Sequence, residues 1–147
     1  MEIINILKND KLLEEYIKFC SLEWGSKKPS KEYIKEKKDK ILNTEKVIIV
    51  LALLDNNIML GFISLFKYDG LERQDLTPWY ATMYVKKEYR NKGYSKLLNN
   101  ALLKEAKKLG YNKIYLKTNL DNYYEKYGAV YIDKLNNKEK LYYIDLK

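Results

Sequence analysis

The chain begins with apolar residues at helical spacing, which predicts two helices after a short first strand. Ile3–Leu7 is the expected strand. Asn9 or Asp10 then offers a side-chain cap for a helix. One face of that helix would carry Leu13, Tyr16, Ile17, Cys20 and Trp24. A second, strongly charged helix is marked by Tyr33, Ile34 and Ile41.

The middle of the chain changes to the pattern of strands. Val47–Leu54 is continuously apolar, as expected of a strand covered on both faces. The turn signal Asp55-Asn56-Asn57 separates it from the returning strand Ile58–Phe66. After a polar loop, Pro78 opens a third strand, Trp79–Val85, at a position where proline is tolerated.

The last third predicts further helices and strands. Gly93–Leu109 has an apolar face of Tyr94, Leu98, Ala101, Leu102 and Leu109, and Gly110 is placed to end it. The expected order continues with the strand Lys113–Thr118, a short helix Asp121–Tyr127 and the strands Val130–Ile132 and Leu141–Leu146. This order predicts a mixed α/β fold, a mostly antiparallel sheet of about six or seven strands flanked by about four helices. We expect one domain over residues 1–147.

Composition narrows the classes of function. The longest apolar run is far shorter than the roughly 20 residues of a membrane span, and the N-terminus lacks a signal-peptide pattern. Cys20 is the single cysteine, so an internal disulfide is impossible and a reducing, cytoplasmic compartment is expected. The chain contains no histidine, which excludes Ser-His-Asp and Cys-His catalysis and argues against a metal site.

Most of the net charge of +8 lies in one segment. Residues 86–113 hold nine basic side chains and two acidic ones, which gives +7. Within this segment a strand ends at Val85, a basic loop with Arg90 and Lys92 turns, and Gly93 opens a helix. The first amides of a helix have no internal partner, and the helix dipole makes that end electropositive. The pattern therefore predicts a cradle for phosphate or diphosphate.

Two motifs in this arrangement resemble the GNAT superfamily of acyl-CoA N-acyltransferases. Met83-Tyr84-Val85 followed by Arg90 to Ser95 resembles the family's strand end and its Arg/Gln-x-x-Gly-x-Gly/Ala loop, with Ser95 in place of the usual Gly or Ala. Tyr123 to Gly128 resembles the late Tyr-Glu-Lys-x-Gly motif. The order of the predicted elements also resembles that of the family from end to end.

The resemblance implies an acetyl-CoA-dependent N-acetyltransferase in which an amine attacks the thioester directly, with no metal. It implies a bulge that parts the strand Trp79–Val85 from Lys113–Thr118, leaving a slot for pantetheine. Tyr124 is the implied general acid that protonates the departing thiolate. The implied acetyl-CoA contacts are Met83, Tyr84, Val85, Arg90, Asn91, Lys92, Gly93, Tyr94, Ser95 and, as the family asparagine, Asn119 or Asn122.

The group that deprotonates the amine stays open. Without histidine, Glu72 and Asp75 on the loop before Trp79 are candidate bases, together with Asp69 and Glu45. The acceptor is expected to be a primary amine of a small molecule or a protein, and a homodimer is left open as the assembly.

Two other functions compete with the enzyme. One is a non-catalytic acyl-CoA sensor that keeps the cradle but does not turn over. The other is a nucleic-acid-binding domain that uses the basic segment, which is disfavoured because the chain has two arginines and no nucleic-acid motif. We therefore expect neither a nucleic acid nor a membrane as partner.

Overall fold

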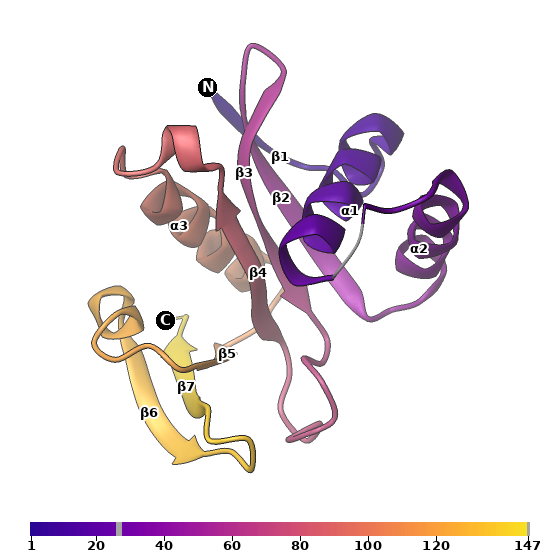
Figure 1. Ribbon diagram of the computed structural model, residues 1–147. Coiled ribbons are helices and arrows are strands. Elements are labelled where there is room, and N and C mark those ends of the chain that lie inside the picture. The colour runs from indigo at the N-terminus through magenta and orange to yellow at the C-terminus, as the bar shows by residue number, and fades with distance from the viewer. Residues whose placement is uncertain (26–27, 147) are drawn as a thin grey trace.

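The computed structural model describes residues 1–25 and 28–146, and it places seven strands in one sheet with helices on both faces (Figure 1). The strands are β1 (Glu2–Asn5), β2 (Val47–Asp55), β3 (Ile58–Phe66), β4 (Trp79–Val85), β5 (Lys113–Thr118), β6 (Ala129–Lys134) and β7 (Lys140–Asp145). The helices are α1 (Asp10–Trp24), α2 (Lys31–Asn43) and α3 (Tyr94–Lys108), with two 3₁₀ turns, η1 (Lys87–Tyr89) and η2 (Tyr124–Tyr127).

The sheet has the order β1-β2-β3-β4-β5-β7-β6. Its neighbouring strands pair antiparallel except β4 and β5, which run parallel. The predicted mixed α/β fold with a mostly antiparallel sheet is therefore confirmed. Among the described residues, no helix is long and apolar enough to span a bilayer.

The continuous apolar run of β2 is explained by two cores, one on each face of the sheet. Ile49, Leu51 and Leu53 pack in one cluster with buried residues of α3, whereas Val50 and Ala52 pack in the other with α1 and α2. Side chains of a strand alternate between faces, so a strand buried on both faces must be apolar at every position. The prediction for this segment is confirmed.

Side-chain caps set the starts of the first two helices. The Asn9 side chain accepts a hydrogen bond from the amide of Leu12 at 3.1 Å, so Asn9 rather than Asp10 caps α1. Ser30 caps α2 in the same way, accepting from the amide of Tyr33 at 3.1 Å. Each cap satisfies an amide that has no partner inside its helix.

Three details differ from the sequence prediction. The expected helix Asp121–Tyr127 is reduced to the 3₁₀ turn η2, which the left-handed Gly128 (φ 87°) ends. Trp24 and Leu109, expected on apolar helix faces, are each 55% exposed. Trp24 is the last residue of α1, and Leu109 is the C-cap of α3, so both lie where a helix ends. Helical spacing identifies a face but not where that face stops being covered.

Candidate active site

A bulge in β4 opens the sheet at its centre. Phe62 on β3 pairs with Tyr84, but Ser64, two residues later, pairs with Ala81, so β4 holds one extra residue. Thr82 lies at this irregularity with φ 46°, a left-handed conformation that is rare for a β-branched residue. Such strain is concentrated at functional sites and persists only where the surroundings hold it.

A partly buried hydroxyl cluster holds the bulge in place. The hydroxyl of Tyr16 on α1 lies 2.9 Å from that of Ser64 and 3.2 Å from that of Thr82. The Thr82 hydroxyl donates to Ser64 at 2.5 Å. Burial raises the pKa of Tyr16, so its phenol stays protonated. The cluster ties the irregular backbone of β4 to α1 and β3.

Beyond the bulge, β4 and β5 separate. Their pairing is confined to Trp79 opposite Tyr115, with the Tyr115 amide donating to the carbonyl of Pro78 at 2.9 Å. Figure 1 shows the two strands diverging from this point toward η1. The predicted splay of the two strands is present, and it leaves backbone of β4 without a partner strand on that side.

The end of the splay meets the start of α3, where amides are free to bind an anion. Gly93 caps α3 with φ 80°, a conformation that glycine adopts at little cost, and it has no side chain to accept from the first amides. Asn91 is also left-handed, with φ 65°. The first turn of α3 contains no acidic residue. This end of the helix therefore has the partial positive charge of the dipole and no competing carboxylate.

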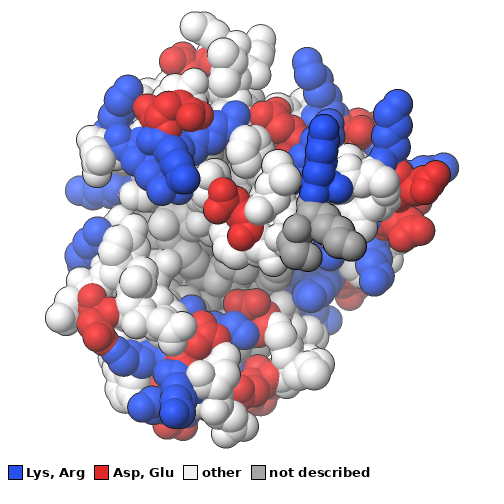
Figure 2. All heavy atoms as spheres, in the orientation of Figure 1, with Lys and Arg blue, Asp and Glu red and all other residues white. Residues whose placement is uncertain are grey.

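Basic side chains surround this helix start. Figure 2 shows Lys and Arg side chains gathered where Figure 1 places η1, with the surface hollowed below them. Arg90 is exposed, donates from Nε to the carbonyl of Val85 at 2.8 Å and lies over the ring of Tyr84 at 5.3 Å. Lys92 is exposed, and Tyr94 and Ser95 are half-buried in the first turn of α3. The structure thus brings Arg90–Ser95 to the open end of the slot.

Tyr124 lies on the other side of the slot within a group of tyrosines. Its ring is 5.5 Å from that of Tyr80 on β4 and 4.8 Å from that of Tyr123. The Tyr80 hydroxyl in turn donates to the sulfur of Met83, next to the bulge. The Tyr124 hydroxyl makes no hydrogen bond to any residue that the structure describes. Burial and the neighbouring Tyr123 and Tyr127 raise the pKa of Tyr124 to about 12.

The asparagine expected to contact CoA lies just after β5. Asn119 is exposed, and the preceding Thr118 hydroxyl accepts from the amide of Leu120 at 3.0 Å. Asn122, the other candidate, has a left-handed backbone with φ 57°. Both lie in the segment that joins β5 to η2, beyond the point where β4 and β5 separate.

Two of the candidate bases serve to hold the loop before β4. Arg73 donates to both carboxylate oxygens of Asp75, at 3.0 and 3.1 Å, and this pairing lowers the pKa of Asp75. Glu72 accepts from the amide of Asn136 at 3.0 Å. A carboxylate whose pKa is lowered binds a proton less readily, so Asp75 is a weaker base than an ordinary aspartate.

The pKa of Asp69 is shifted in the opposite direction to that of Asp75. Burial raises its pKa, and the positive charges of Lys117 and Lys46 oppose that rise. Glu45 is exposed and lies 3.9 Å from Lys67. Of these four carboxylates, Asp69 therefore combines partial burial with an increased affinity for a proton.

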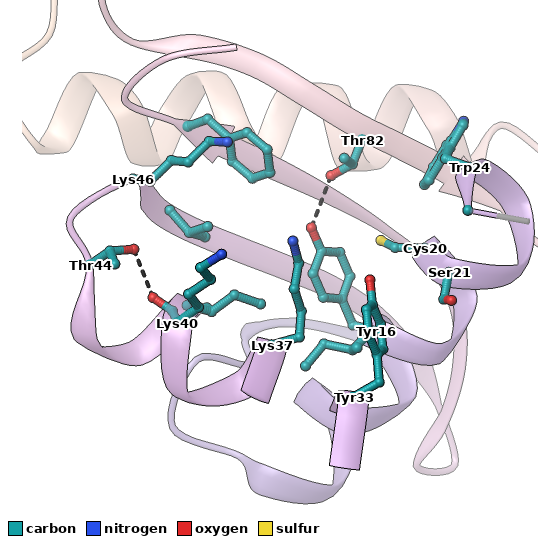
Figure 3. Close-up of a pocket in the computed structure, with 15 residues that line it drawn as sticks. Tyr16, Cys20, Ser21, Trp24, Tyr33, Lys37, Lys40, Thr44, Lys46 and Thr82 are labelled. Atoms are coloured by element: carbon teal, nitrogen blue, oxygen red, sulfur yellow. Dashed lines mark hydrogen bonds between the residues drawn. The ribbon is translucent and has the colours of Figure 1, made fainter. Parts of the chain in front are cut away.

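A cavity of about 540 Å³ opens on the face of the sheet that α1 and α2 cover (Figure 3). Thr82 of the bulge is part of its lining, so the cavity reaches the point where β4 leaves its regular course. Its size is within the range of small-molecule sites. Cys20 is also part of the lining, and burial raises the pKa of its thiol to about 11.

Sequence reasoning missed most of this cavity. Tyr33, Lys37 and Lys40 of α2 and its C-cap Thr44 all line the cavity, and they recur at spacings of four, three and four residues. The stripe lies beside the buried one that contains Ile34. A polar stripe at helical period next to an apolar one was the available signal, but it is also typical of an ordinary solvated face.

No group of three or more His, Cys, Asp or Glu side chains within residues 1–25 and 28–146 is placed to hold a metal ion.

Comparison with known proteins identifies the arrangement. The profile described as the acetyltransferase (GNAT) family matches residues 9–129. No protein of curated function matches the sequence significantly.

Solved structures share the whole fold. An aminoglycoside 6'-acetyltransferase type Ii superposes with a TM-score of 0.73 and 23% identity, covering 100% of this chain and 98% of its own. An aminoglycoside 6'-N-acetyltransferase complexed with coenzyme A gives a TM-score of 0.75 at 20% identity, with coverages of 100% and 98%. A putative acetyltransferase from Salmonella typhimurium with its cofactor acetyl-CoA gives 0.68 at 16% identity, with coverages of 100% and 94%.

Proposed function

This chain belongs to the acetyltransferase (GNAT) family and is an acetyl-CoA-dependent N-acetyltransferase; we propose that its acceptor is a primary amine that binds in the cavity between α1, α2 and the bulge of β4. The observation that carries the proposal is the bulge itself. Thr82 lines the cavity on one face, and the next residue, Met83, contacts Tyr80 beside Tyr124. An amine in the cavity and a thioester in the slot would meet at this point.

Acetyl-CoA would bind along the slot with its diphosphate at the start of α3. The amides of Tyr94 and Ser95 and the charges of Arg90 and Lys92 suit the diphosphate. Backbone groups of Met83 and Val85 on the unpaired side of β4 suit the pantetheine amides. Asn91, Gly93, Asn119 and the backbone of Tyr84 would border the same path.

The reaction needs one proton removed and one supplied. The amine nitrogen attacks the carbonyl carbon, the new C–N bond forms, and the C–S bond breaks as the sulfur takes its electron pair. Tyr124 donates its phenolic proton to this sulfur. The proton that the amine loses then restores the phenol. A backbone amide near Met83 would stabilise the oxyanion, a contribution of about 10²–10³ in rate. No step calls for a metal ion.

Turnover is the direct test of this function. With acetyl-CoA and a panel of primary amines, the purified protein is expected to release free thiol in proportion to N-acetylated product, measured by a thiol reagent and by mass spectrometry. Tight CoA binding without product from any amine would instead support the acyl-CoA sensor.

Asp69 is our favoured base, acting through a water molecule, ahead of Glu72 and Asp75. Asp69→Asn is expected to lower kcat/KM for the amine by about 10²-fold at pH 7. The difference in kcat/KM between the two proteins should shrink as the pH approaches the pKa of the amine, because a deprotonated amine needs no catalytic base. The measurement is the pH profile of both proteins. Asp75→Asn is the matched control and should leave the profile unchanged; equal losses in the two variants would contradict the assignment.

We also propose a cytoplasmic location and a homodimer. A cytoplasmic location suits an enzyme that consumes acetyl-CoA and has a single cysteine. A homodimer is supported by β6, an edge strand whose Val130, Tyr131 and Ile132 are 47%, 53% and 39% exposed. The proposal assigns the basic segment to CoA and needs neither nucleic acid nor membrane.

A further inference from the structure

Three lysines turn into the proposed acceptor cavity. Lys37 and Lys40 reach it from α2, and Lys46, which directly precedes β2, reaches it as well. Figure 3 shows their side chains extending into the same space between α2 and the sheet. The Lys37 charge is felt at the Cys20 thiol on the opposite wall, where it lowers the pKa against the larger effect of burial.

Little negative charge opposes these lysines. None of the described residues that line the cavity is acidic. Asp69, outside the lining, lies close enough to Lys46 for the lysine charge to lower its pKa against the larger effect of burial. Lys37 and Lys40 form no salt bridge with any residue in the described ranges. Lys37 and Lys40 therefore have no carboxylate within 4.0 Å in the described part of the chain.

The rest of the wall is aromatic and apolar. Tyr16 and Trp24 come from α1, Tyr33 from α2 and Phe66 from the end of β3. Such a wall suits an apolar chain or ring between two polar ends. One polar end is the amine that must reach Thr82, and the other would lie at the lysines.

We propose, resting on the function above, that the acceptor is a primary amine that also carries a carboxylate, which Lys37 and Lys40 bind. The amine would then point to the bulge and the apolar body would lie against the aromatic wall. A polycationic amine would place further positive charges beside the lysines, which is unfavourable. The preferred acceptor thus differs in charge from the aminoglycosides in the names of the structural neighbours.

Matched acceptors test the proposal. Aminohexanoate and aminohexanoamide have the same chain length and terminal amine and differ in the charge of the far end. The kcat/KM of the carboxylate is expected to exceed that of the amide by about tenfold, and the ratio should fall as salt is added. Kanamycin serves as the polycationic comparison.

Substitution of the lysines identifies the group that selects the charge. In Lys37→Gln/Lys40→Gln the two kcat/KM values should become equal, mainly through loss for the carboxylate. Lys31→Gln/Lys35→Gln removes the same charge from the same helix, outside the cavity lining, and should keep the tenfold preference. Thermal melts of both variants should match the wild type, because all four side chains are exposed.

The outcomes separate this inference from the function on which it rests. Equal or better turnover of the amide or of kanamycin by the wild type would overturn the inference and leave the acetyltransferase intact. If no amine is acetylated, the proposed function fails, and calorimetry with CoA-loaded protein decides the inference instead. Acetamidohexanoate must then bind about tenfold more tightly than its amide, and the lysine variant must lose that difference. Equal binding, or none, would overturn it.

Discussion

Replacing Tyr124 with phenylalanine is expected to lower kcat about 10²-fold and to leave KM for acetyl-CoA nearly unchanged. The substitution removes the hydroxyl that we propose protonates the leaving thiolate, and it keeps the ring that packs on Tyr80 and Tyr123. A positioned general acid typically increases the rate by about 10²–10⁴-fold, and we expect a loss at the lower end of that range.

The pKa of Tyr124 explains why we expect the smaller loss in kcat. At about 12 it exceeds the pKa of a free thiol, about 8.5, so proton transfer to the sulfur is uphill. The thiolate forms in the same partly buried place, which raises its own affinity for a proton and reduces the difference. The raised pKa also keeps the phenol protonated at every ordinary assay pH. The rate should therefore rise with pH as the amine loses its proton, with no fall from Tyr124 below about pH 11.

Steady-state kinetics with acetyl-CoA and one good amine measure the effect. Tyr127→Phe is the matched control, because it removes a hydroxyl from the same aromatic group and the same 3₁₀ turn. Its kcat should stay close to that of the wild type. Equal kcat in Tyr124→Phe and the wild type would remove Tyr124 from the mechanism.

The order of elements could be predicted because most segments carry one dominant signal. β3, β4 and β5 have the predicted bounds, since turn residues or a proline mark their ends. The fourth expected helix, Asp121–Tyr127, is too short to be stable by itself. Only its last four residues, Tyr124–Tyr127, form a 3₁₀ turn. A short segment is decided by its tertiary contacts more than by its pattern.

The cavity and the bulge could not be predicted from the residues alone. Nothing local in Trp79–Val85 indicates that Thr82 is left-handed; the hydroxyls of Tyr16 and Ser64, 66 and 18 positions away, hold it. The pairing of these three groups is known only once α1 lies on the sheet. Lys37 looks like a solvated lysine in the sequence, because the cavity that it lines is completed by residues of α1 and the sheet, far from it along the chain.

The second large effect concerns acetyl-CoA binding at the start of α3. Arg90→Ala combined with Gly93→Glu is expected to weaken CoA binding by at least about 10²-fold, measured by titration calorimetry. The variant would lose the charge-assisted contact that we propose between Arg90 and the diphosphate, worth about 1.5–3 kcal/mol. The new glutamate places a negative charge at the positive end of the helix dipole, where the diphosphate would lie.

Backbone strain must be separated from this loss, because residue 93 is left-handed. Gly110 provides the control at the other end of α3: its φ is 95° against 80° for Gly93, and at both positions an added Cβ would meet no atom within 4 Å. Gly110→Glu therefore carries a similar conformational cost, about 1–2 kcal/mol, and adds the same charge far from the cradle. It should lower the melting temperature at least as much as Gly93→Glu, because a carboxylate is unfavourable at the negative end of the helix dipole, and it should bind CoA like the wild type. If the Arg90/Gly93 variant stays folded and binds CoA within about threefold of the wild type, the diphosphate does not lie at this helix end, because the lost contact alone would account for a larger change.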